Sequence, residues 1–99
     1  MSGTEKKRYR LTTVTADGYV EDQIQDRPFT LEQLQKAVRG YIETVCYFSK
    51  YDGKKARVYA NEEGIIRDLP INRWASEEWN RQNPYSTFLH GNIAIQTRV

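Results

Sequence analysis

The sequence has few of the side chains that build most metal and nucleophilic sites, with one cysteine and one histidine in 99 residues. A single cysteine excludes an internal disulfide, and together with His90 it supplies too few ligands for a zinc site of the usual type. Cys46 lies in the apolar run YIETVCYF, which predicts a small buried residue in a strand. His90, between Leu89 and Gly91, is typical of a partly buried residue at a strand edge.

The sequence also lacks long apolar runs and the common catalytic motifs. No stretch is long enough to cross a bilayer and no signal-peptide core follows the basic start, so we expect a cytosolic protein without membrane contact. G-x-S-x-G, H-E-x-x-H, Walker and dinucleotide-binding patterns are all missing. Glu62 and Glu63 are adjacent, but consecutive residues in a turn point apart, which favours a solvated turn over an acid–base pair. We therefore expect a non-enzymatic protein with no catalytic residue, metal or cofactor.

The charge of the chain is small and unevenly distributed. Four of the 15 basic residues fall within residues 1–10 beside the single acid Glu5, so the remainder holds 11 basic and 12 acidic side chains. Phosphate binding needs cations gathered on a formed face, so this distribution disfavours nucleic acid as a partner. The sequence predicts a disordered basic arm over residues 1–7, followed by a single domain over residues 8–99.

Patterning predicts an α+β fold with an antiparallel sheet of about five strands. Thr30 and Gln33 form a capping box before an amphipathic helix over about Leu31–Arg39, and Gly40 should provide the left-handed residue that ends it. Ser76 is a plausible N-cap for a second, short helix over about Glu77–Gln82. The expected strands are 9–15 and 19–25, joined by a two-residue turn at Asp17-Gly18, then 41–48, 56–61 and 91–97, with a short addition at 65–66.

Several blocks occur in an order that resembles a known family. These blocks are L-x-x-L-Q-x-x-V-x-G-Y-I-E-x-V from Leu31, N-E-E-G from Asn61, L-P-x-N-R from Leu69, and a strand led by Gly91. The chain is similar over about residues 20–97 to small proteins of phages, other large DNA viruses and conjugative elements, a family named as a domain of unknown function. This resemblance implies a viral or mobile-element protein of the host cytoplasm. It also implies a gene among the early, non-structural functions of such elements, where antagonists of host defence collect.

The LPINR segment and the residues after it are the best candidate for a binding site. Pro70 and Asn72 suit a tight structural corner, but the same loop also presents Arg73 and Trp74 beside Arg67. Guanidinium groups match phosphates, and an indole offers a stacking face for a base. The hypothetical ligand-binding set is Asn61, Arg67, Asn72, Arg73, Trp74, Tyr85 and Asn92. Trp74, Trp79 and Tyr85 could equally pack the second helix onto the sheet, which leaves core and binding surface as alternatives.

Three functions remain open from the sequence. The first is capture of a small nucleotide-derived host signal by the arginine and tryptophan group. The second is inhibition of a host defence protein through an exposed aromatic surface or a free sheet edge. The third is nucleic-acid binding through the basic arm. The sequence does not decide the oligomeric state, and it leaves a homodimer open.

Overall fold

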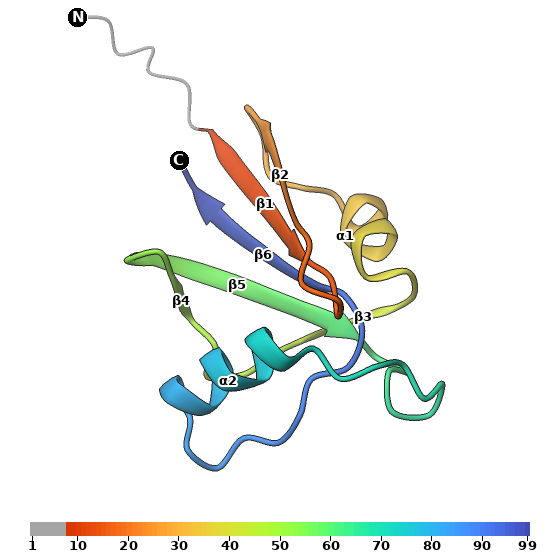
Figure 1. The fold of residues 1–99 in the computed structure, drawn as a ribbon. Coiled ribbons are helices and arrows are strands. Elements are labelled where there is room, and N and C mark those ends of the chain that lie inside the picture. The colour runs from red at the N-terminus through yellow and green to blue at the C-terminus, as the bar shows by residue number, and fades with distance from the viewer. Residues whose placement is uncertain (1–7) are drawn as a thin grey trace, which may run out of the picture.

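A computed structural model describes residues 8–99, which form a β-sheet with two α-helices (Figure 1). The predicted arm, residues 1–7, lies outside the described residues. The elements along the chain are β1 (Tyr9–Val14), β2 (Val20–Gln25), α1 (Leu31–Val38), β3 (Ile42–Thr44), β4 (Lys50–Tyr51), β5 (Lys54–Asn61), α2 (Arg73–Gln82) and β6 (Ile93–Arg98). The prediction of an α+β fold with an antiparallel sheet and two helices is confirmed.

The sheet has six strands, and every pairing is antiparallel. Five of them lie in the order β2-β1-β6-β5-β3, and the sixth, β4, pairs with β5 outside this order. β6, the last strand in the chain, lies between β1 and β5 (Figure 1). β3 and the additional short strand β4 pair with opposite ends of β5. The C-terminal ends of β1 and β5 therefore lie at the same end of the sheet as the start of β6. β2 forms one edge of the sheet.

Helix α1 forms as its sequence predicts at the start but differs at the end. The Thr30 hydroxyl accepts from the Gln33 backbone N–H, and the Gln33 side chain accepts from the Thr30 N–H, so the capping box is present. The left-handed residue at the other end is Arg39, with φ of 60°, and not Gly40. Gly40 is needed for a different reason, because a Cβ there would lie 2.6 Å from the Asn61 amide nitrogen.

Helix α2 begins earlier than the sequence indicated. Asn72 and not Ser76 is the N-cap, with its side-chain oxygen accepting from the Ala75 backbone N–H. Ser76 lies inside the first turn, where its hydroxyl donates back to the Asn72 carbonyl. The helix thus carries Arg73 and Trp74 on its first turn. Sequence analysis had placed these two residues in a loop.

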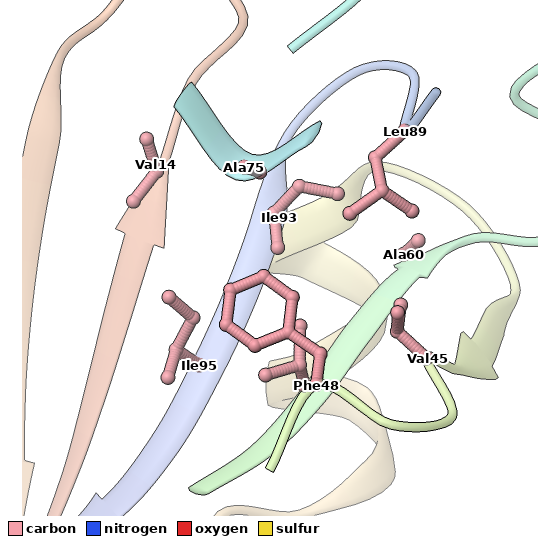
Figure 2. Packing of buried hydrophobic residues seen from close by; sticks show 9 residues of the cluster. Val14, Val45, Phe48, Ala60, Ala75, Leu89, Ile93 and Ile95 are labelled. Atoms are coloured by element: carbon pink, nitrogen blue, oxygen red, sulfur yellow. The ribbon is translucent and has the colours of Figure 1, made fainter. Parts of the chain in front are cut away.

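The helices cover opposite faces of the sheet, so the core has two parts. α1 packs its buried side chains against Leu11 and Ala94. On the other face, α2 and the loop after it cover the larger cluster, where Phe48 occupies the middle (Figure 2). Ile93 and Ala94 are consecutive in β6 and point to different faces, which explains why this strand is buried almost throughout. The larger cluster consists of Val14, Val45, Phe48, Val58, Ala60, Ala75, Leu89, Ile93 and Ile95.

Three local predictions are wrong. The β1–β2 turn is longer than two residues, as the pairing of Val14 with Val20 shows. Of Asp17 and Gly18, only Gly18 has the positive φ that the predicted two-residue turn requires of both. Residues 65–66 form part of a turn and not a strand. Cys46 is exposed because β3 ends at Thr44 and the chain then turns through Tyr47, whose φ is 64°.

Candidate functional site

The structure does not bring the predicted ligand-binding residues together. Arg67 and Asn92 line one surface hollow at the end of the sheet, whereas Arg73 lines a separate groove along α2. Trp74 packs edge-on against the Tyr51 ring, with centroids 5.8 Å apart and an interplanar angle of 85°. Arg73 and Trp74 are consecutive on a helix, so their side chains leave the axis about 100° apart. The single pocket formed by Arg67, Arg73 and Trp74 is therefore not present.

Asn61 holds backbone groups and does not face a ligand site. Its amide donates to the carbonyls of Val38 and Arg39 at 3.2 and 3.3 Å, and its oxygen accepts from the Glu63 N–H at 2.8 Å. Asn92 has a related role, since its amide donates to the Ala37 carbonyl at 3.2 Å. Both asparagines thus satisfy carbonyls at the C-terminal end of α1, which have no partners within the helix.

Asn72 plays the corresponding part for α2. Its side chain is 1% exposed, and its amide donates to the Val14 and Gly91 carbonyls at 2.9 and 3.0 Å. With its oxygen capping the Ala75 N–H, the side chain joins α2 to β1 and to the start of β6. The Asn72 side chain therefore belongs to the scaffold, as the alternative of a structural corner implied.

The aromatic side chains around α2 divide between core and surface. Trp79 packs against the larger core cluster, and its indole N–H donates to the Cys46 carbonyl at 2.8 Å. Tyr85 is 93% exposed in the segment that follows the helix, and Phe88 is 62% exposed. Trp79 therefore packs with the core, as one alternative expected, whereas Tyr85 is exposed and its role as a binding residue stays a prediction.

The groove beside Phe88 is formed by α2 and the segments on either side of it, and we refer to it as the α2 groove. Its volume is about 780 Å³. Phe88 and Ile71, which is 46% exposed, supply apolar walls. The charged lining residues are Arg73, Glu77 and Arg81, and Arg81 is paired with the neighbouring Glu78 carboxylate. The buried Ser86 hydroxyl in its wall has no hydrogen-bond partner among residues 8–99. The lining residues are Ile71, Arg73, Ser76, Glu77, Asn80, Arg81, Ser86, Thr87 and Phe88.

A second concavity lies where the C-terminal end of α1 meets the β1–β2 turn and the segment before α2. We call it the Arg39–Arg67 hollow, and its volume is about 570 Å³. Sequence analysis had considered Arg67 and Asn92 but not Arg39 or Asp17, which also line it. No local pattern marks Arg39 as a site residue, because its neighbours come from distant segments. The lining residues are Ala16, Asp17, Val38, Arg39, Arg67, Leu69, Pro70, Gly91 and Asn92.

Within residues 8–99, the titratable group with a perturbed pKa is Tyr51, which lines neither of the two concavities. Burial, followed by the Asp22 and Asp52 carboxylates, raises the pKa of Tyr51, while Arg10 acts in the opposite direction. His90 is partly buried, and its backbone forms an isolated antiparallel β-bridge with Ile71. Its side-chain Nδ1 lies 2.9 Å from the Leu69 carbonyl oxygen. Over residues 8–99, no group of three or more His, Cys, Asp or Glu side chains is arranged to hold a metal ion. Neither helix in that range has the length and apolar character to span a membrane.

Comparison with known proteins identifies a family but no characterised relative. No curated protein and no solved structure matches the chain. A family model described as Domain of unknown function (DUF3846) matches residues 9–97, which is almost all of the described fold and includes both concavities. The chain therefore belongs to the DUF3846 family.

Proposed function

We propose that this protein is a non-enzymatic accessory protein of a phage, virus or other mobile element, and that it binds a host protein through the α2 groove. The observation that carries the proposal is the exposure of Ile71 and Phe88, which both line the α2 groove. Large apolar side chains gathered around a concave surface are typical of protein interaction sites.

The apolar part of the groove gives a partner a place to anchor. Phe88 and Ile71 both line it, and their exposed area is removed from water only when another molecule covers it. Binding energy at interfaces is concentrated in a few apolar or aromatic side chains that fill such pockets. We therefore expect one apolar side chain of the partner to insert between Phe88 and Ile71.

The charges around the groove indicate the rest of the partner segment. Arg73, Arg81 and Glu77 are the charged residues that line the groove. Arg81 is already paired with the Glu78 carboxylate, whereas Arg73 forms no ion pair within residues 8–99. Complementary charge aids association and selects the register of binding. The expected occupant is a host protein segment that carries an apolar residue and, beside it, an acidic side chain that pairs with Arg73.

The biological setting of the proposal rests on the resemblance to proteins of mobile elements. In that setting, binding would counteract a host defence protein in the host cytoplasm. The non-enzymatic part of the proposal is supported by the absence of catalytic motifs from the sequence.

Site-specific photo-crosslinking in host cells tests this proposal. A photo-crosslinking amino acid replaces Phe88 in the test protein and Tyr41, an exposed aromatic residue that does not line the groove, in the matched control. We expect one discrete host adduct from position 88 alone. Adding Arg73→Glu should reduce its yield several-fold, because the groove then repels an acidic segment.

Binding of the purified host protein should then weaken by at least tenfold on Phe88→Ala, as expected for loss of a central aromatic contact. Equal adducts from positions 88 and 41, or no adduct from either, would contradict the proposal. An adduct between two copies of the chain would replace the host partner with a homodimer.

A further inference from the structure

The Arg39–Arg67 hollow has the composition of a site for a small phosphate-bearing ligand. Its arginines come from segments far apart in the sequence, and the fold brings them to one concavity of about 570 Å³. That size falls within the range of small-molecule sites. Guanidinium groups present several N–H donors in a plane and match phosphate oxygens better than a lysine does.

The backbone around the hollow removes an obstacle to anion binding. The C-terminal end of a helix carries partial negative charge on its free carbonyls, and such an end repels phosphate. Here the carbonyls of Ala37, Val38 and Arg39 already accept hydrogen bonds from the amides of Asn92 and Asn61. The helix end beside the hollow therefore has carbonyls that are largely satisfied.

Arg39 ends helix α1 in the left-handed conformation. Its φ of 60° and ψ of 45° place a long side chain in a region where glycine is preferred at a helix end. This conformation fixes the direction in which the Arg39 side chain leaves the helix end beside the hollow. Glycine at this position would relieve the strain and remove the guanidinium group.

The remaining lining residues fit the non-phosphate part of a nucleotide. Leu69 and Pro70 give an apolar wall for a flat ring. Asp17 lies on the same hollow and is held by the Thr15 hydroxyl, which donates to its carboxylate at 2.6 Å. A carboxylate opposes a free phosphate but accepts hydrogen bonds from ribose hydroxyls.

We infer that the Arg39–Arg67 hollow binds a nucleoside phosphate, with the phosphate on the two arginines and the sugar hydroxyls on Asp17. This site is separate from the α2 groove, since the two concavities share no lining residue. It therefore adds a small-ligand function to the proposed protein interaction. Either activity can be lost by mutation while the other is retained.

Thermal unfolding and calorimetry with four probes test the inference: AMP, a cyclic dinucleotide, adenosine and inorganic phosphate. At 100 times its dissociation constant, a bound nucleotide should raise the Tm by about 10 to 20 °C. Adenosine and inorganic phosphate should each bind at least tenfold more weakly than the better nucleotide. No stabilisation by either nucleotide, or equal affinity for adenosine, would overturn the inference. Equal affinity for inorganic phosphate would also reject it, because the site would then not recognise the nucleoside.

The decisive variant is Arg39→Gly, for which binding and stability should move in opposite directions. Glycine relieves the left-handed strain, so the Tm should rise by about 5 °C, while nucleotide affinity falls at least tenfold. Tyr47→Gly is the matched control, because Tyr47 has a φ of 64° and does not line the hollow. It should raise the Tm without changing affinity. Unchanged nucleotide binding by the Arg39→Gly protein would refute the assignment.

Asp17→Asn separates recognition of the sugar from recognition of the phosphate. Removing the carboxylate should strengthen binding of inorganic phosphate severalfold, because a like charge is lost from the hollow. The same change should reduce the preference for AMP over inorganic phosphate, because a carboxylate accepts hydroxyl hydrogen bonds more strongly than an amide. An unchanged preference would exclude Asp17 from contact with the sugar and overturn that part of the inference.

Discussion

Replacing Asn72 with alanine is expected to lower the free energy of unfolding by about 3 to 5 kcal/mol. The change removes three hydrogen bonds, to the Val14 carbonyl, the Gly91 carbonyl and the Ala75 N–H. Each of the three bonds contributes about 1 kcal/mol net. The buried groups left unpaired together cost about 1 kcal/mol more, because water cannot reach them. Only 1% of the side chain is exposed, so rehydration does not offset the loss.

Urea denaturation followed by tryptophan fluorescence measures this effect. A domain of this size has about 5 to 15 kcal/mol of total stability, so the variant should lose a third or more of it. The Tm should fall by about 15 to 25 °C. Asn80→Ala is the matched control on the same helix, since Asn80 is exposed and should change stability by about 0.5 kcal/mol or less. A loss below about 1 kcal/mol on Asn72→Ala would refute the structural role.

Asn72→Asp distinguishes the two halves of the side chain. The introduced carboxyl retains an acceptor for the Ala75 N–H but faces the Val14 and Gly91 carbonyls without a donor when ionised. Burial and these carbonyls should raise its pKa in the folded state. The folded protein then binds a proton more readily than the unfolded chain, so the defect should shrink as the pH falls below the folded-state pKa. A defect independent of pH would contradict this account.

Two further predictions concern the scaffold. Gly40→Ala should lower the free energy of unfolding by about 2 kcal/mol, measured by urea denaturation. The new Cβ would lie 2.6 Å from the Asn61 amide nitrogen and displace it from the Val38 carbonyl. Unchanged stability would show that Asn61 can move freely. Ultraviolet titration should show the Tyr51 phenol ionising above the ordinary pH range of a tyrosine, because burial and the Asp22 carboxylate raise its pKa. The folded state then binds more protons than the unfolded one, so this group removes stability as the pH rises above about 10. Asp22→Asn should bring the ionisation of Tyr51 to lower pH, and no change would exclude the carboxylate as a cause.

The fold could be predicted where its signals are local. The capping box at Thr30 and Gln33 depends on residues three positions apart, and it is present as expected. The start of α2 could not be read in this way. Its N-cap, Asn72, is fixed by carbonyls 58 and 19 positions away in the sequence. Ser76 offered a competing local signal, although its hydroxyl is used inside the helix.

The candidate site was predictable only in part, because sequence proximity does not determine side-chain direction. Arg73 and Trp74 are neighbours, yet one lines the α2 groove and the other packs on Tyr51. Conversely, Arg39 and Arg67 line one hollow although 28 positions separate them. The two arginines lie at one hollow because α1 and the segment before α2 pack at the same end of the sheet. No short sequence pattern encodes that packing.

The three asparagine amides at one end of the sheet have a consequence for how the molecule comes apart. Asn61 and Asn92 fasten α1 from one face, and Asn72 fastens α2 from the other. Detaching α1 would leave the amides of Asn61 and Asn92 without their acceptors, and detaching α2 would leave the Val14 and Gly91 carbonyls without their donor. Opening of either helix therefore breaks hydrogen bonds to the rest of the fold at this end. Amide protons in α1, α2 and β6 should therefore exchange with solvent through one common event instead of peeling away helix by helix.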